Sequence, residues 1–216
     1  MNRVSTPAAA QPPAKTPRGR RGRPRSYLKV VFSPGVAPDK WFTRFDQRTP
    51  GWAIASARLD HPLSAVEAGS ADVAIARLPV AGVSKEEHHM VRLYEEAIGV
   101  AASTDHPIAV MREVTLEDVE QEVVLYRTPV EGEVEPAAVR SALAIVSTGA
   151  GIAIAPRPLL RGLNYRGVAH CDVGGDTQAA GIPGTQVALV WRTDRDDEVI
   201  QQFVGICRGR REGSSR

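Results

Sequence analysis

The order of the structural elements is decided by residues 27–76, whose sequence is YLKVVFSPGVAPDKWFTRFDQRTPGWAIASARLDHPLSAVEAGSADVAIA. Short β-branched apolar runs are typical of buried strands, and apolar residues at helical spacing, such as Trp41, Phe42 and Phe45, predict the helices between them. The segment predicts strand, helix, strand, helix and strand at 27–33, 37–48, 52–59, 62–69 and 70–76. Because the connections are tight, we expect a parallel sheet with right-handed crossovers in an α/β fold. The three aromatic side chains are expected in the core or at a dimer contact.

The rest of the chain predicts a second group of elements and then a return to the first. Predicted strands lie at 90–95, 97–102, 122–126, 152–155, 168–171 and 186–191, and predicted helices at 115–121, 136–147, after 156, and at 196–208. Thr115 is expected to cap its helix, because Asp118 follows three positions later. The predicted architecture therefore has two lobes, and the chain runs from the first to the second and back.

Five local phrases follow one another along the chain: Leu28 to Ser33, LSAVEAGSADVAIA at 63–76, Asp105-His106-Pro107, ALAIVSTGAGIAIAP at 142–156 and VALVW at 187–191. In this order they resemble the effector-binding (substrate-binding) domain of LysR-type transcriptional regulators, whose two-lobed fold is shared with type 2 periplasmic binding proteins. The resemblance covers about residues 27–207. It implies a domain at 26–208, with lobe one at about 27–95 and 165–208 and lobe two at about 97–160.

Two features depart from that family. Its regulators carry an N-terminal winged helix-turn-helix and a linker helix, and the first 25 residues, rich in proline and glycine, have no room for them. The stretch between Tyr126 and Pro136 is also too short for the additional helix and strand of fuller relatives, so a trimmed second lobe is expected.

The formal net charge of +2 conceals a strong segregation of charge along the chain. Residues 1–25 carry seven basic side chains and no acidic one, residues 26–207 carry a net charge of −8, and residues 208–216 carry +3. The N-terminal segment has almost no large apolar side chains to offset its ordering entropy, so disorder is expected there. This pattern predicts basic tails, at 1–25 and 209–216, that bind a polyanion beside an acidic globular body.

The N-terminal tail contains Arg21-Gly22-Arg23-Pro24, which resembles the core of the AT-hook, a short DNA-binding segment. Glycine lets the backbone lie close to the groove floor, and flanking arginines favour the negative potential of narrow A·T tracts. The expected DNA-binding residues are Arg18, Gly19, Arg20, Arg21, Gly22, Arg23, Pro24 and Arg25. The alternative is a generic basic solubilising tail or an RNA-binding Arg/Gly segment.

The family resemblance implies a ligand between the lobes, held by helix N-termini and hinge residues. The residues that it points to are Ser33, Gly35, Arg77, Ser103, Thr104, Thr128, Thr148 and Gly149. The guanidinium of Arg77 could hold both oxygens of a small carboxylate effector. The alternative is that the serines are caps or turn residues and that Gly149 only ends a helix.

No catalytic residue, metal site or cofactor is predicted. Three groups of reactive side chains are expected to be structural or solvated: His88 and His89, Cys171 and Cys207, and Glu131, Glu133 and Glu135. Neighbours on a strand point to opposite faces, so His88 and His89 cannot easily share an ion and are expected at the surface. The cysteines are expected to pack as small apolar residues, and the glutamates to lie in a solvated loop.

The leading hypothesis is a non-enzymatic, homodimeric regulator or nucleoid accessory protein that binds A·T-rich DNA. One alternative is a cytosolic small-molecule-binding module. A weaker one is an enzyme on the same fold, such as the short-form ATP phosphoribosyltransferases, disfavoured because no acidic pair precedes the phrase at 147–151. A cytoplasmic location is expected, since there is no apolar run of about 18 residues and no secretory signal.

Overall fold

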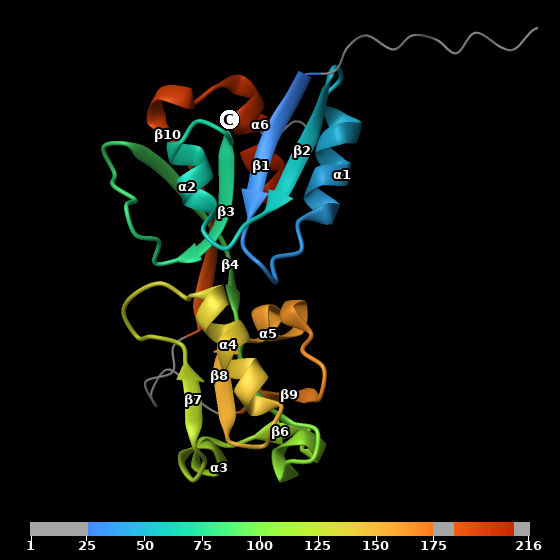
Figure 1. Ribbon diagram of the computed structural model, residues 1–216. Helices are drawn as coiled ribbons and strands as arrows, with labels where there is room; N and C mark the ends of the chain where they lie inside the picture. Colours follow the sequence, from blue (N-terminus) through green and yellow to red (C-terminus); the bar gives the residue numbers. More distant parts are fainter. Residues whose placement is uncertain (1–25, 175–183, 210–216) are drawn as a thin grey trace, which may run out of the picture.

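The computed structural model describes residues 26–174 and 184–209, which form two lobes joined by a pair of strands (Figure 1). The predicted AT-hook core and both basic tails lie outside the described residues, apart from Arg208 and Gly209. Among the described residues, no helix is long and apolar enough to cross a membrane.

Lobe one is a five-stranded sheet in the order β2-β1-β3-β10-β4. Its strands are β1 (Ser26–Phe32), β2 (Trp52–Arg58), β3 (Val73–Leu78), β4 (His88–Glu96) and β10 (Thr185–Arg192). Its helices are α1 (Asp39–Arg48), α2 (Pro62–Glu67) and α6 (Glu198–Cys207), with a short 3₁₀ turn, η2 (Thr193–Arg195). The first three strands are parallel, as predicted, and β10 runs antiparallel to both of its neighbours.

Helices cover both faces of this sheet, which explains why its central strands are mostly apolar. On one face, Phe45 of α1 and Phe203 of α6 pack edge to face, with ring centroids 5.7 Å apart. On the other face, Leu63 and Val66 of α2 pack against Val31. Of the aromatic residues expected in the core or at a dimer contact, Phe45 is a core residue, and Trp41 and Phe42 pack partly buried against the core.

Lobe two is a second five-stranded sheet, in the order β6-β9-β5-β8-β7. Its strands are β5 (Ile98–Ser103), β6 (Glu113–Val114), β7 (Val124–Arg127), β8 (Ile152–Pro156) and β9 (Val168–Val173). Its helices are η1 (Pro107–Val110), α3 (Leu116–Glu120), α4 (Pro136–Val146) and α5 (Arg157–Leu163). Helix α3 begins with the predicted capping box, in which the Thr115 hydroxyl accepts from the Asp118 backbone N–H and the Asp118 carboxylate accepts from the Thr115 N–H.

Lobe two differs from the sequence prediction at its C-terminal boundary and agrees with it at the connection before α4. The predicted return to lobe one at about residue 165 is wrong, because β9 pairs with β5 along its length and so belongs to lobe two. The chain returns only with β10, whose first residue, Thr185, lies opposite Glu96 at the end of β4. The connection at 128–135 contains no helix or strand, in line with the short stretch that the sequence shows there.

Candidate ligand-binding cleft

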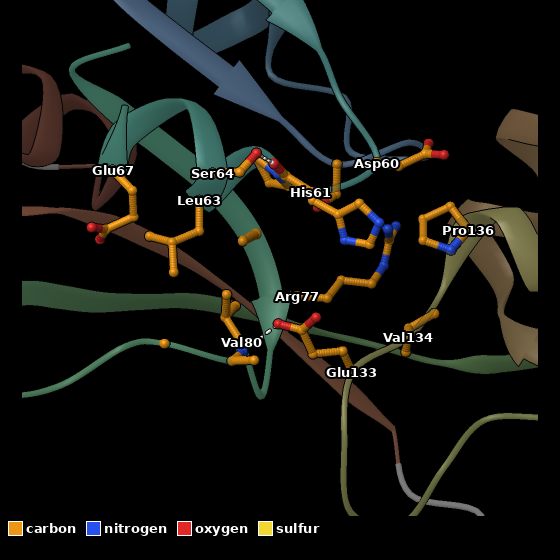
Figure 2. Close-up of a pocket in the computed structure, with 15 residues that line it drawn as sticks. Asp60, His61, Leu63, Ser64, Glu67, Arg77, Val80, Glu133, Val134 and Pro136 are labelled. Carbon is orange, nitrogen blue, oxygen red and sulfur yellow. Dashed lines mark hydrogen bonds between the residues drawn. The ribbon is translucent and has the colours of Figure 1, made fainter. Parts of the chain in front are cut away.

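A cavity of about 220 Å³ lies where the two lobes face each other (Figure 2). Lobe one contributes Ser33, Asp60, His61, Pro62, Leu63, Ser64, Glu67, Ala76, Arg77, Val80, Ala81 and Gly82, and lobe two contributes Glu133, Val134 and Pro136. Pockets for small molecules commonly hold about 300–1,000 Å³. This cavity is therefore suited to a small ligand.

The parallel strands of lobe one explain why these side chains meet. The carboxyl ends of parallel strands share one edge of a sheet, and ligands commonly bind in the crevice outside that edge. Ser33 directly follows β1, Asp60 and His61 follow β2, and Arg77 lies near the end of β3. The cleft therefore opens at this edge.

Arg77 is the most buried charged side chain of the cleft, and its guanidinium is already occupied. Its Nε donates to Glu96 Oε2 at 2.6 Å and its Nη2 donates to Glu96 Oε1 at 3.0 Å. A third bond runs from Nη1 to the Pro34 carbonyl, and the Thr185 hydroxyl donates to Glu96. Arg77 was expected to bind the carboxylate of a ligand. It binds the carboxylate of Glu96 instead, at the point where the chain leaves lobe one.

Burial also affects the tyrosine next to this pair. Burial, together with the negative charge of Glu96, raises the pKa of Tyr94 to about 12. A charged phenolate is disfavoured in a poorly solvated place beside a carboxylate. Tyr94 is therefore neutral beside the buried carboxylate of Glu96.

Polar contacts cross from one lobe to the other at the mouth of the cleft. Asp60 forms a two-pronged ion pair with Arg140 of α4, in which Nη1 lies 3.2 Å from Oδ1. The backbone N–H of Ala81 donates to Glu133, and His61 Nε2 lies 3.5 Å from Glu135 Oε2. These contacts hold the loop at 128–135 against lobe one.

The two lobes also come close together at Gly35, in the loop at 33–38 that follows β1 and is called here the β1 loop. Its φ of +86° lies in the left-handed region, and a Cβ there would be 2.5 Å from the Pro158 carbonyl oxygen. Gly162, one turn further along α5, faces the same loop, since its Cβ would lie 2.9 Å from Gly35 Cα. Only glycine permits this contact between the β1 loop and α5.

The family described as LysR substrate binding domain matches residues 21–212. The chain belongs to this family. No curated protein matches it significantly. Among solved structures, it is similar to the BenM effector binding domain with its effector benzoate, at 16% identity and a TM-score of 0.62, covering 85% of this chain and 90% of that one.

Two further solved members resemble this LysR substrate-binding domain. CbnR, a LysR family transcriptional regulator, matches with 14% identity and a TM-score of 0.63, covering 85% of this chain and 69% of that one. A mutant of OxyR from Corynebacterium glutamicum, bound to H2O2, matches with 20% identity and a TM-score of 0.60, covering 87% of this chain and 65% of that one. At these identities the structures support the two-lobed fold.

Four residues predicted for the cleft of this LysR domain lie elsewhere: Ser103, Thr104, Thr148 and Gly149. Strand β5 starts at the crossing and runs away from it, so Ser103 ends the strand at the far side of lobe two. Helix α4 likewise starts at the cleft with Pro136, and its 11 residues carry Thr148 about 16 Å away. Their placement at the cleft is therefore wrong, and Gly149, with a φ of +82°, follows the C-terminus of α4.

Of the other four predicted residues, Ser33 and Arg77 line the cavity, and Gly35 forms the lobe contact. Thr128 is buried at the cleft end of β7, but its N–H and its hydroxyl both donate to the Ile154 carbonyl. It fixes the strand end and does not line the cavity.

Sequence reasoning missed Asp60, His61, Ser64, Glu67 and Glu133 as residues of the cleft. A signal for Asp60 and His61 was present, because the rule applied to the end of the first strand applies equally to the end of the second. Glu133 carried no such signal. Glu133 lies in a loop and contacts Ala81, which stands 52 positions earlier in the sequence.

The two histidines on β4 differ from the prediction in one respect. They face opposite sides, as expected, but His88 is only 4% exposed and is not a surface residue. Its Nδ1 accepts from the Ser84 backbone N–H and its Nε2 contacts Glu67. His89 is exposed and lies 3.6 Å from Asp196.

Both cysteines are free and pack as small apolar residues, as predicted. The Cys171 thiol donates to the Ile108 carbonyl, and Cys207 packs against the core of lobe one. Burial raises the pKa of both thiols. Neither position favours a reactive thiolate.

Proposed function

We propose that this protein is a DNA-associated transcriptional regulator or nucleoid accessory protein without enzymatic activity. Its LysR substrate-binding domain senses a small ligand in the cleft between the lobes, and its N-terminal tail binds A·T-rich DNA. The observation that carries the sensing role is the cavity at the carboxyl edge of the lobe-one sheet, closed by the loop at 128–135. The proposed location is the cytoplasm, at the nucleoid.

The division of charge supports a division of labour between tail and body. Residues 26–207 carry a net charge of −8 and repel DNA, whereas the first 25 residues carry +7. The Arg21-Gly22-Arg23-Pro24 core would enter the minor groove of A·T tracts. A homodimer would place two tails on one DNA and raise the affinity of each by effective concentration.

Two candidate effectors follow from the cleft. A small carboxylate was expected from Arg77, and that guanidinium is now engaged by Glu96. The remaining acidic residues of the cavity, Asp60, Glu67 and Glu133, favour a cation. A ligand of either kind would regulate DNA binding only if the open and closed lobes place the tails differently.

The decisive experiment is electrophoretic retardation of A·T-rich and G·C-rich duplexes at two salt concentrations. The full chain is expected to retard A·T-rich DNA more strongly than G·C-rich DNA. The logarithm of its affinity should fall with the logarithm of the salt concentration, with a slope of about 0.9 per neutralised phosphate. Deletion of residues 1–25 is expected to abolish retardation and to leave thermal unfolding unchanged. Undiminished DNA binding by the truncated chain would overturn the role of the tail.

A matched variant separates groove recognition from charge. Arg21→Lys with Arg23→Lys keeps the charge but removes the planar guanidinium groups. It is expected to lose the preference for A·T-rich DNA while keeping a similar salt slope. If the preference survives, the guanidinium groups do not provide it, and if the original chain shows no preference, the tail is a generic basic segment. If no chain retards DNA at low salt, the protein is a ligand-binding module without a DNA function.

A further inference from the structure

Three metal-ligating side chains meet at the mouth of the cleft, although they come from both lobes. His61 directly precedes α2 of lobe one, whereas Glu133 and Glu135 belong to the loop before α4 of lobe two. One ligand atom from each residue lies within 4.8 Å of the other two. We call these three residues the mouth cluster.

The backbone positions of the mouth cluster are restrained. His61 and Glu135 each stand directly before a proline, which disfavours the helical conformation for both residues, and Glu135 is extended. Both are N-cap residues, yet neither side chain caps its helix, and the two side chains approach each other instead. Glu133 is held from the other lobe by the Ala81 N–H. The donor groups are therefore brought together by fixed backbone.

Within residues 26–174 and 184–209, His61 is the basic residue that contacts a carboxylate of the mouth cluster. Among the described residues, neither Glu133 nor Glu135 forms an ion pair with arginine or lysine. The arginines that face the cleft from β3 and α4 are already paired, with Glu96 and Asp60. Two carboxylates that no arginine or lysine neutralises attract a divalent cation and repel a carboxylate ligand.

One imidazole nitrogen and two carboxylate oxygens form a donor set that suits divalent transition metal ions such as Zn²⁺. Zinc binds these atoms at about 2.0–2.2 Å, so the donors around one ion lie within about 4 Å of one another. Small side-chain rotations bring atoms 4.8 Å apart into that range, since the side chains of His61 and Glu135 are partly exposed. Three protein donors leave a coordination position for water or for a ligand in the cavity.

We propose that His61, Glu133 and Glu135 bind one divalent transition metal ion that ties the two lobes together at the mouth of the cleft. The inference rests on the sensing part of the proposed function, because the ion closes the same cleft. The proposed effector is thus a metal cation and not the carboxylate that was expected from Arg77. The ion stabilises the closed arrangement because its ligands come from both lobes.

The test is calorimetric titration of the full chain with ZnCl2, without DNA, together with thermal unfolding. The expected result is one equivalent of Zn²⁺ per chain and a higher unfolding temperature. His61→Ala, Glu133→Gln and Glu135→Gln are each expected to weaken binding at least tenfold. Cobalt(II) is expected to give a visible absorption spectrum in the original chain and to lose it in the His61→Ala variant.

His89→Ala is the matched control, because His89 is also an exposed histidine beside one carboxylate but lies on another side of lobe one. It is expected to bind Zn²⁺ like the original chain. Equal binding by the original chain and the mouth-cluster variants, or no stoichiometric binding, would overturn the metal site.

A parallel titration with sodium benzoate separates this failure from failure of the sensing role. If benzoate stabilises the chain and Zn²⁺ does not, the sensing cleft stands and the metal site is overturned. If neither ligand binds, the metal site is overturned and the cleft senses neither Zn²⁺ nor benzoate.

Discussion

Two arginine–carboxylate pairs border the cleft, and they differ in almost every physical respect. Arg77 and Glu96 lie at the strand end where the chain leaves lobe one, and their side chains are 4% and 0% exposed. Asp60 and Arg140 cross the mouth of the cleft, with side chains 30% and 43% exposed. The first pair joins elements within lobe one and the second joins the two lobes.

The two pairs differ in how much each is expected to contribute to stability. Loss of one partner from a buried pair leaves an uncompensated charge in a poorly hydrated place, which is strongly unfavourable. An exposed pair is screened by water and salt and contributes little to stability. Breaking the exposed pair at the mouth is therefore expected to cost less free energy than breaking the buried pair within lobe one.

The largest expected effect comes from breaking the buried pair. Glu96→Gln leaves Arg77 without a counter-charge and is expected to lower the free energy of unfolding by about 3–5 kcal/mol. Urea denaturation measures this loss. The same change removes the negative charge that raises the pKa of Tyr94, so the alkaline titration of that phenol should move below about 12.

A double variant tests whether the loss comes from the unpaired charge. Arg77→Met with Glu96→Leu removes both charges and replaces them with apolar side chains of similar size. It is expected to be clearly more stable than Glu96→Gln alone. If the double variant is at least as unstable as the single one, the pair acts through its shape and hydrogen bonds to Pro34 and Thr185.

An intermediate loss of stability is expected when the contact between the β1 loop and α5 is disturbed. Gly35→Ala adds a Cβ against the Pro158 carbonyl at a φ of +86° and is expected to cost about 2–3 kcal/mol. Gly51→Ala is the control, because Gly51 has a φ of +88° and no atom within 4 Å of its added Cβ. It should cost only about 1 kcal/mol. Equal costs in chemical denaturation would mean that the lobe contact contributes nothing.

The smallest effect on stability is expected at the mouth. Arg140→Gln should lower the free energy of unfolding by less than about 1 kcal/mol, and this loss should shrink at high salt. Small-angle scattering should nevertheless report a larger radius of gyration as the lobes separate. Arg192→Gln breaks an exposed pair with Asp194 within lobe one and should leave the radius unchanged. A large loss of stability in Arg140→Gln would remove the distinction between the two pairs.

Most of the fold could be predicted from the sequence because its signals are local. Runs of β-branched residues, helix caps such as Thr115 and turn glycines each depend on near neighbours, and every predicted strand and helix is present. The assignment of β9 to the wrong lobe had a physical cause. A strand's own residues do not specify its partner, and β9 pairs with a strand about 70 positions earlier.

The cleft was predicted less completely because it depends on strand direction and distant contacts. Ser33 was located correctly, since it follows the first parallel strand. Ser103 was misplaced because β5 runs away from the crossing. His88 was expected at the surface, but its burial depends on Glu67 and on the backbone N–H of Ser84. Periodicity along the chain contains no information about these pairings.

The register between Glu96 and Thr185 has a further consequence for how the molecule is built. The chain leaves and re-enters lobe one at directly opposed residues of two antiparallel strands. A short turn between β4 and β10 would therefore complete an ordinary hairpin and leave the lobe-one sheet whole. In architectural terms, the elements from β5 to β9 are an insertion at the tip of one hairpin of a five-stranded domain.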